Sequence, residues 1–184
     1  QPGMRVLDFG AGIGSYAVPL AKKVGGSGKI WALTRSAVDA QFLYYSKGKN
    51  ELNPLQVMIG LESHFDLDTE AQRRAFSKID FVRIGVAESV AGLISRGARF
   101  FRENSPLVMF AIKSQDNSHL TGSVSRFKLL GYDTYRFVPG LPLLLPFAFD
   151  RELDGFALNL FACKKDKADL LEKQGLLIQK IELL

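Results

Sequence analysis

The sequence has few side chains that bind metals or form covalent cross-links, because its 184 residues include one cysteine and two histidines. The single cysteine, Cys163, excludes an internal disulfide and a cysteine-based zinc site. It lies in a late apolar segment, so we expect a buried thiol. His64 and His119 lie far apart in the sequence and neither is accompanied by a cluster of acidic residues. We therefore expect no metal site.

Long apolar runs and a leader segment are missing as well. No apolar stretch reaches the roughly 20 residues that a membrane-spanning helix needs, and the N-terminus lacks the charged-then-apolar pattern of a signal peptide. We expect a cytoplasmic protein without a membrane partner. With 47% hydrophobic residues, the chain is long enough for one domain over 1–184. It begins almost at its first expected strand, so we expect that an upstream segment is missing or belongs to a longer protein.

The charge is mildly basic, with a formal net charge of +5. This charge permits an anionic partner but does not require one. The basic residues occur in small groups such as Lys22 with Lys23 and Arg73 with Arg74, which is typical of solvated helix faces and loops. Aromatic residues do not alternate with them as on a surface that binds single-stranded nucleic acid. We therefore do not expect nucleic acid as the main partner.

Short apolar runs alternate with segments of helical period, which is typical of an α/β fold with a largely parallel sheet. The strands are expected at 5–9, 29–33, 55–59, 81–84, 107–112, 133–138 and 156–163. The helices are expected at 15–24, 36–49, 69–77, 88–103, 117–130 and 165–174. The pattern predicts a Rossmann-like, doubly wound, mostly parallel seven-stranded sheet with helices on both faces.

The segment GLPLLLPFAFDRELDG, residues 140–155, joins the last two expected strands. Pro142 and Pro146 predict that it is not a regular element throughout. It is nevertheless rich in leucine and phenylalanine. These side chains either cover one end of the sheet or present an apolar surface to a partner or substrate.

The stretch RVLDFGAGIGSYAVPLA carries the strongest functional signal, because an apolar strand leads through Asp8 into three alternating glycines and then into a helix. The glycines are Gly10, Gly12 and Gly14. Glycine allows backbone conformations that other residues avoid and lets a ligand approach closely, and the helix N-terminus offers free N–H donors. The dinucleotide fingerprint needs a glycine where this chain has Ser15, so NAD is disfavoured.

An acidic residue two positions before such a turn is typical of class I S-adenosylmethionine-dependent methyltransferases. The segments PGMRVLDFGAGIGSYA, KIDFVRIGVAES, GARFFRENSPLVMFAIK and LLGYDTYRF resemble, in order and spacing, the FkbM-type branch of that class. The resemblance covers most of the chain. It implies S-adenosylmethionine (SAM) as cofactor and methyl transfer to a hydroxyl oxygen, often on a sugar or a natural product such as a polyketide. It also implies that Asp8 serves the amino group of the cofactor and that the glycine turn carries its methionine part.

The sequence departs from the family at four acidic positions. Thr34 replaces the glutamate that ends the second strand, Gly85 and Ala87 replace the acids of the KID and EG motifs, and Ala111 replaces the glutamate after Phe110. Loss of the ribose-binding carboxylate weakens cofactor binding by roughly one to three decades. The chain is therefore either an enzyme with weakened cofactor binding or a degenerate domain that serves as a binding module.

Thr34, Arg35 and Gly85 complete the expected cofactor site. Thr34 would accept one ribose hydroxyl, and Arg35 would stack on adenine or meet a phosphate, so that NADP stays open as a ligand. Arg35 also fits an exposed cation at the start of a helix.

The candidate catalytic residues are Glu88, Lys113 and His119, any of which would replace the missing acids. Each also has a structural interpretation: a first-turn helix acid, a solvated strand-end cation and a surface or capping residue, respectively. Methylation of nucleic acid bases is disfavoured, because 85–87 read Gly-Val-Ala where base-methylating enzymes need an Asn/Asp-Pro-Pro-aromatic stretch or a Pro-Cys pair. We expect a small-molecule acceptor.

Overall fold

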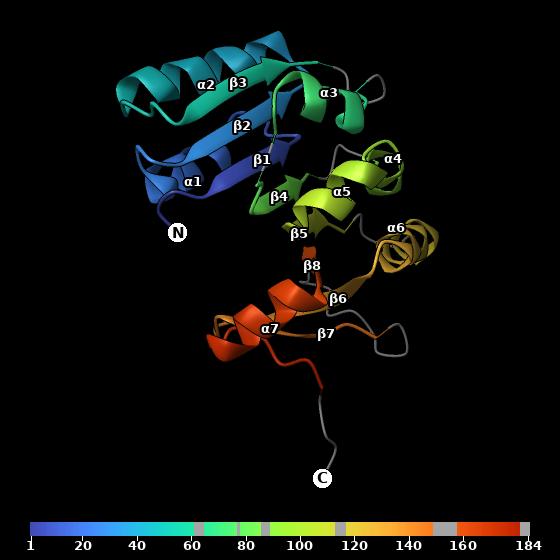
Figure 1. Cartoon of the computed structure of the whole chain (residues 1–184). Helices are drawn as coiled ribbons and strands as arrows, with labels where there is room; N and C mark the ends of the chain where they lie inside the picture. Colours follow the sequence, from blue (N-terminus) through green and yellow to red (C-terminus); the bar gives the residue numbers. More distant parts are fainter. Residues whose placement is uncertain (61–64, 77, 86–88, 113–116, 149–157, 181–184) are drawn as a thin grey trace.

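The computed structural model describes residues 1–60, 65–76, 78–85, 89–112, 117–148 and 158–180. An eight-stranded sheet with the order β3-β2-β1-β4-β5-β8-β6-β7 forms its centre (Figure 1). The strands are β1 (Arg5–Phe9), β2 (Lys29–Thr34), β3 (Leu55–Ile59), β4 (Phe81–Ile84), β5 (Leu107–Ala111), β6 (Tyr132–Val138), β7 (Leu143–Pro146) and β8 (Asn159–Lys164). The helices are α1 (Ala17–Val24), α2 (Ala37–Lys49), α3 (Leu67–Arg73), α4 (Val90–Ser95), α5 (Ala98–Asn104), α6 (Asn117–Leu129) and α7 (Lys165–Lys173).

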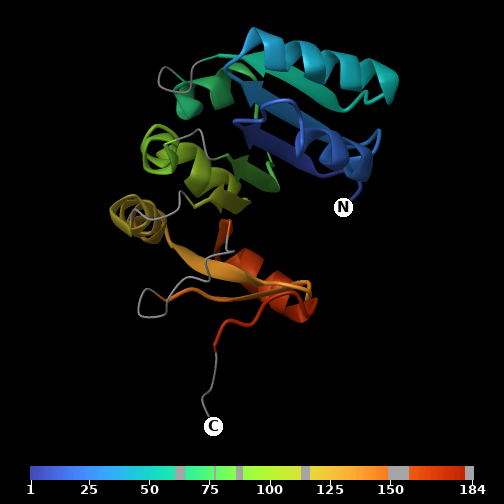
Figure 2. The same ribbon diagram turned by 180° about the vertical axis from the view of Figure 1, so that it is seen from behind.

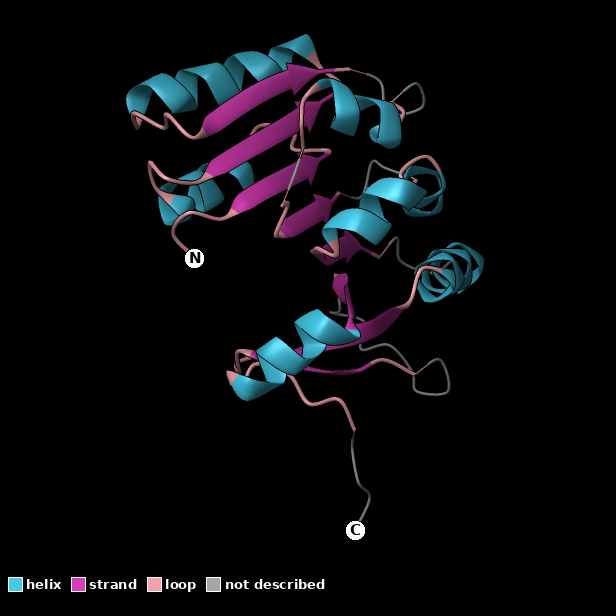
Figure 3. Ribbon diagram, viewed as in Figure 1, coloured by secondary structure: helices cyan, strands magenta, loops and turns pink. Residues whose placement is uncertain are grey.

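Strands β1 to β5 pair in parallel, and β6, β7 and β8 add antiparallel pairs at one side. This confirms the expectation of a Rossmann-like, mostly parallel sheet. Figure 3 shows the arrowheads of β1, β2 and β3 pointing the same way. The carboxyl ends of neighbouring parallel strands therefore meet at one edge, where ligands of open α/β sheets bind.

Helices cover both faces of the sheet, as Figures 1 and 2 show from opposite sides. One apolar core joins α1 and α2 to alternate residues of β1 and β2, including Val6 and Ile30. A larger core joins helices α3 to α6 to strand residues on the opposite face of the sheet, including Leu7 of β1 and Val82 of β4. Because successive strand side chains point to opposite faces, the near-continuous apolar runs of these strands follow from burial on both sides.

The count of seven strands was wrong, because β7 forms inside the segment that was expected to be irregular. It pairs antiparallel with β6, with Leu143 opposite Val138 and Pro146 opposite Tyr135. Pro146 is tolerated because β7 is the last strand of the sheet, where a missing N–H breaks no central ladder. Leu144 is buried, which supports the packing interpretation for this residue.

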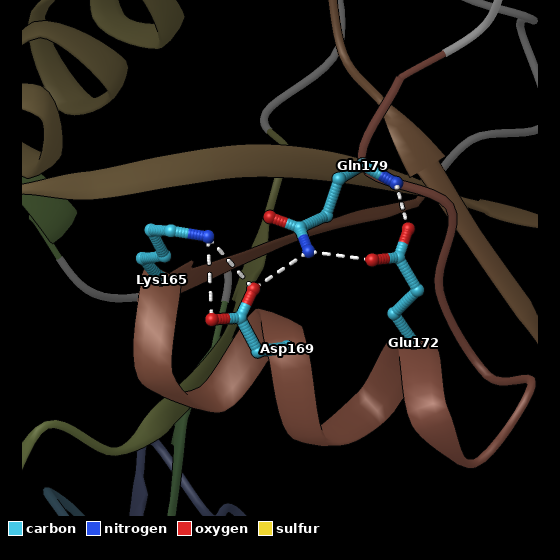
Figure 4. Close-up of polar contacts among 4 residues, drawn as sticks. All are labelled: Lys165, Asp169, Glu172 and Gln179. Carbon is cyan, nitrogen blue, oxygen red and sulfur yellow. Dashed lines mark hydrogen bonds and ion pairs between the residues drawn. The ribbon is translucent and has the colours of Figure 1, made fainter.

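The segment after α7 lies along β7 and is held by side chains of α7. Leu144 N donates to Leu176 O over 2.9 Å, and Ile178 N donates to Leu144 O over 3.0 Å. Gln179 Nε2 donates to Asp169 Oδ1 over 2.8 Å and to Glu172 Oε2 over 2.7 Å (Figure 4). The tail therefore pairs with the outer edge of β7.

The single helix expected over 88–103 is also wrong, because α4 and α5 are separate. A Cβ on Gly97, between them, would lie 2.6 Å from Leu67 Cδ2, so α3 packs directly on the break. Asp68 caps the new helix, since its carboxylate accepts from Arg99 N over 3.1 Å and from Phe100 N over 2.7 Å. Side-chain capping of these free N–H groups lets α5 begin independently.

Cys163 is fully buried, as predicted, and burial raises the pKa of its thiol to about 12. No helix in the described part of the chain is long and apolar enough to cross a membrane.

Candidate functional site

The glycine turn follows β1 directly and uses backbone conformations that favour glycine. The φ angles of Gly10, Gly12 and Gly14 are 72°, 52° and 101°. All three lie in the region that side chains with a Cβ adopt rarely. A Cβ on Gly14 would lie 2.6 Å from Leu43 Cδ2 of α2, whereas a Cβ on Gly12 would meet nothing within 4 Å. Gly14 therefore packs the turn onto α2, and Gly12 borders open space.

Asp8 is buried beneath this turn and faces β4. Asp8 pairs in register with Arg83 of β4, and Arg83 Nη1 donates to Asp8 Oδ1 over 3.1 Å. The second oxygen, Oδ2, is buried and accepts no hydrogen bond from the residues that the structure describes. Burial outweighs the attraction to Arg83 and raises the pKa of Asp8 to about 6.

Arg83 lies at the centre of the site, although the sequence interpretation passed over it. The same Nη1 also donates to Gly10 O over 2.9 Å. The guanidinium carbon lies 4.4 Å from the ring centroid of Tyr16, a cation–π distance. The available signal was a basic residue in the middle of the apolar strand FVRI, between the buried positions Val82 and Ile84.

Gly85 follows β4 and makes the space that the guanidinium of Arg83 fills. Its N–H donates to Phe9 O over 2.8 Å, which fixes it beside β1. A Cβ built on Gly85 would lie 2.9 Å from Arg83 Nη1 and 3.0 Å from Gly10 O. A side chain at this position and the observed guanidinium therefore compete for the same volume.

A carboxylate lies beside the end of β2 in spite of the missing strand-end acid. Thr34 is buried, and its Oγ1 lies 3.5 Å from Asp39 Oδ2 in the first turn of α2. Ser36 caps this helix, accepting from Asp39 N over 3.2 Å. Sequence reasoning compared only the strand position and missed Asp39, although the Ser36-x-x-Asp39 spacing of a capped helix start was the signal. Arg35 is exposed between these residues.

A cavity of about 90 Å³ lies at the end of β5, between α4 and α6. Its lining includes Ser89, Phe110, Ala111, His119 and Ser123. Ser123 Oγ donates to the backbone oxygen of His119 over 2.9 Å, a bond within α6, which forms this wall of the cavity. The volume is large enough for several waters or for the reacting end of a small acceptor.

No protein-family model matches the sequence, and no curated protein matches it as a relative. Solved structures do match. A SAM-dependent O-methyltransferase from Thermotoga maritima aligns over 99% of this chain and 62% of its own, with a TM-score of 0.60 and 19% identity. Fibrillarin from Aeropyrum pernix, with natively bound SAM, aligns over 89% of this chain and 67% of its own, with a TM-score of 0.62 and 17% identity. A protein from Clostridium thermocellum, named as a candidate rRNA methylase, aligns over 89% and 86%, with a TM-score of 0.63 and 10% identity.

The chain has the fold of the SAM-dependent methyltransferases. It spans 62% of the length of the Thermotoga protein. The Thermotoga protein is SAM-dependent, and the Aeropyrum fibrillarin contains natively bound SAM. At these identities the comparison establishes the fold.

The methyltransferase fold brings some of the predicted site residues together and separates others. Asp8, Gly10 and Gly85 meet around Arg83, and Thr34 lies at the end of β2 beside Asp39. His119 lines the separate cavity at the end of β5.

The two other catalytic candidates, Glu88 and Lys113, lie outside the described residues, as does Ala87. Across the described ranges, no group of three or more His, Cys, Asp or Glu side chains could hold a metal ion.

Proposed function

We propose that the chain is a SAM-dependent methyltransferase that methylates a hydroxyl oxygen of a small molecule, a sugar or a natural product such as a polyketide. The observation that carries the proposal is the turn of three positive-φ glycines over the buried carboxylate of Asp8. It occupies the carboxyl end of β1, where open α/β sheets bind ligands. The natively bound SAM of the structurally similar fibrillarin supports the choice of cofactor.

The residues present fit the polar groups of this cofactor. Asp8 Oδ2 is a buried acceptor without a donor among the described residues, and Gly10 O lies beside the other carboxylate oxygen through their shared contact with Arg83. Together they suit an ammonium group, which carries donors and no acceptor. The Asp39 carboxylate and the Thr34 hydroxyl suit the ribose hydroxyls.

These positions suggest separate roles for the cofactor, the cavity and His119. When bound, SAM supplies an electrophilic methyl group on a sulfonium centre. The cavity between α4 and α6 would hold the acceptor hydroxyl, and His119 at its wall would take the hydroxyl proton as the methyl group leaves sulfur for oxygen and S-adenosylhomocysteine is released. Holding two reactants in line supplies most of the acceleration in such a transfer, and a positioned base adds to it.

The finer assignment to the FkbM type rests on the sequence motifs, in particular PGMRVLDFGAGIG and KIDFVRIG. The missing acid at Thr34 counts against efficient cofactor binding. A carboxylate 3.5 Å from Thr34 Oγ1 restores an acceptor at this end of β2, so Asp39 supports the enzyme interpretation.

The first test is isothermal titration of the folded protein with SAM and with its demethylated product, S-adenosylhomocysteine (SAH). We expect both to bind and Asp8→Ala to weaken both. No heat at millimolar ligand would overturn the proposal. Transfer of labelled methyl from SAM to a panel of sugars, polyketide alcohols and RNA then identifies the acceptor. If RNA alone became labelled, the acceptor would be nucleic acid and not a small molecule.

A second candidate is a binding module that holds the nucleoside but has no turnover. The contact between Arg83 and Asp8 favours it, because a cation of the chain already lies on the acceptors expected for the cofactor. SAH binding without methyl transfer to any member of the panel would select this alternative.

A further inference from the structure

We infer that Arg83 is an internal stand-in for the ammonium group of the cofactor, so that the amino-acid end of SAM binds only when the guanidinium leaves Asp8 and Gly10. The inference rests on the proposed function and concerns the regulation and ligand preference of the same site. It is carried by the contacts of one nitrogen atom, by the space at Gly85 and by two unsatisfied buried atoms.

The guanidinium makes the contacts that an ammonium would make. Arg83 Nη1 has two hydrogens, which it directs at Asp8 Oδ1 over 3.1 Å and at Gly10 O over 2.9 Å. The side chain of Asp8 is fully buried and that of Arg83 is 11% exposed, so water screens this contact poorly. A second cation on the same two acceptors would meet strong repulsion. Guanidinium and cofactor ammonium therefore exclude one another.

The space for the guanidinium comes from a missing side chain. A Cβ on Gly85 would lie 2.9 Å from Arg83 Nη1, which is closer than real Cβ contacts allow. The absence of a side chain at Gly85 is therefore what allows Arg83 to lie over Asp8.

The contact is incomplete in a way that suits a displaceable partner. Arginine–carboxylate pairs with a permanent structural role are frequently bidentate. Here Asp8 Oδ2 and Arg83 Nε are both buried, and neither has a hydrogen-bond partner within the described ranges. The guanidinium also contacts the ring of Tyr16, which is 38% exposed and borders solvent. Arg83 thus satisfies Oδ1 and Gly10 O but not Oδ2, so its departure breaks a single-nitrogen contact and not a bidentate pair.

The consequence is a preference among ligands that share the adenosine group. A ligand with an amino-acid tail binds only the conformation in which Arg83 has left Asp8. Its apparent affinity is therefore the intrinsic affinity multiplied by the fraction of molecules in that conformation. 5′-Methylthioadenosine has the same nucleoside and a thioether but no ammonium group. Its binding does not require Arg83 to move.

The test is titration calorimetry of the full chain with SAH and with 5′-methylthioadenosine, in the wild type and in Arg83→Met. We expect Arg83→Met to strengthen SAH binding about tenfold or more and to leave 5′-methylthioadenosine within about twofold. Arg102→Met, at an exposed position of α5, is the matched control and should change neither affinity.

Arg83→Met leaves the buried carboxylate of Asp8 without its cation, so far-UV circular dichroism checks that this variant is folded. Gly85→Ala tests the same inference with both charges kept, since its Cβ would lie 2.9 Å from the flexible end of Arg83, and it too should strengthen SAH binding selectively. Its Cβ would also lie 3.0 Å from Gly10 O, so circular dichroism must show that this variant is folded as well. Unchanged or weaker SAH binding in the folded variants would overturn the role of Arg83 while leaving the proposed function intact. Absence of binding of either ligand to the wild type would instead overturn the proposed function.

Discussion

The hydroxyl of Thr34 and the carboxylate of Asp39 lie 3.5 Å apart, which joins the end of β2 to the first turn of α2. The following helix therefore supplies a carboxylate at the end of β2, where the strand itself has none. A carboxylate near a helix N-terminus is also stabilised by the helix dipole. In the proposed function, this carboxylate is the acceptor for the ribose hydroxyls.

We predict that Asp39→Ala weakens SAH binding about tenfold to a hundredfold. A carboxylate that accepts from ribose hydroxyls makes charge-assisted hydrogen bonds worth about 1.5–3 kcal/mol each, and 1.4 kcal/mol corresponds to about tenfold in affinity. Isothermal titration measures the loss. Asp166→Ala is the matched control, because it removes a first-turn acid from α7 and should leave SAH affinity unchanged. Equal affinities in Asp39→Ala and the wild type would place the ribose elsewhere.

The second prediction concerns the pH dependence of stability. Burial raises the pKa of Asp8 from 3.8 to about 6 in the folded protein. Below the unfolded value both states hold the proton, and between the two values only the folded state does, so rising pH favours unfolding. The stabilisation is therefore fully present below about pH 4 and is lost as pH rises through about 6.

Urea unfolding of the wild type and of Asp8→Asn at a series of pH values isolates this effect. We expect the free energy of unfolding of the wild type, relative to Asp8→Asn, to fall by on the order of 2 kcal/mol between about pH 4 and about pH 7. Asparagine keeps the shape of the side chain and does not titrate. A relative stability that instead grows with pH would show that the ion pair with Arg83 outweighs burial.

Local sequence patterns predicted the parallel half of the sheet well, because each strand of that half is an apolar run that ends at a turn or helix signal. The errors lie where tertiary contacts override local preference. The segment with Pro142 and Pro146 forms β7 because β6 offers it an unpaired edge. The helix expected over 88–103 divides because Leu67 and Asp68 of α3 pack on and cap its second half.

The candidate site was predictable to the extent that it is local in sequence. The turn from Asp8 to Gly14 could be read directly, since one strand and one helix define it. Arg83 could not, because its role depends on the register between β1 and β4, which places it beside Asp8. The role of Asp39 could not be predicted either, because it depends on the contact between its carboxylate and Thr34, which only the folded structure shows.

The third prediction separates the structural and binding roles of the glycines in the turn. Gly14→Ala should destabilise the fold by about 2–4 kcal/mol, because it combines a φ of 101° with a Cβ that would lie 2.6 Å from Leu43 Cδ2. Gly12→Ala, with a φ of 52° and open space around its Cβ, should cost only about 1–2 kcal/mol. Thermal and urea unfolding measure the difference.

Gly12→Ala should nevertheless weaken SAH binding, because its methyl group enters the space beside the turn that the cofactor would occupy. Gly48→Ala in α2 is the control, since a Cβ there also meets nothing within 4 Å and lies in a helix away from the turn. Equal SAH affinity in Gly12→Ala and the wild type would mean that the ligand does not lie against the turn.

The last prediction concerns His119, which lines the cavity between α4 and α6. Once an acceptor is identified, His119→Gln should lower kcat about a hundredfold or more, because a positioned base contributes roughly 10²–10⁴-fold to such a step. The dissociation constant of SAH should not change, since the loss concerns proton transfer at the cavity. Ser125→Ala, at an exposed position of the same helix, controls for disturbance of α6 and should keep the wild-type kcat. A variant with full kcat would exclude His119 as the base and leave the methyl transfer to positioning alone.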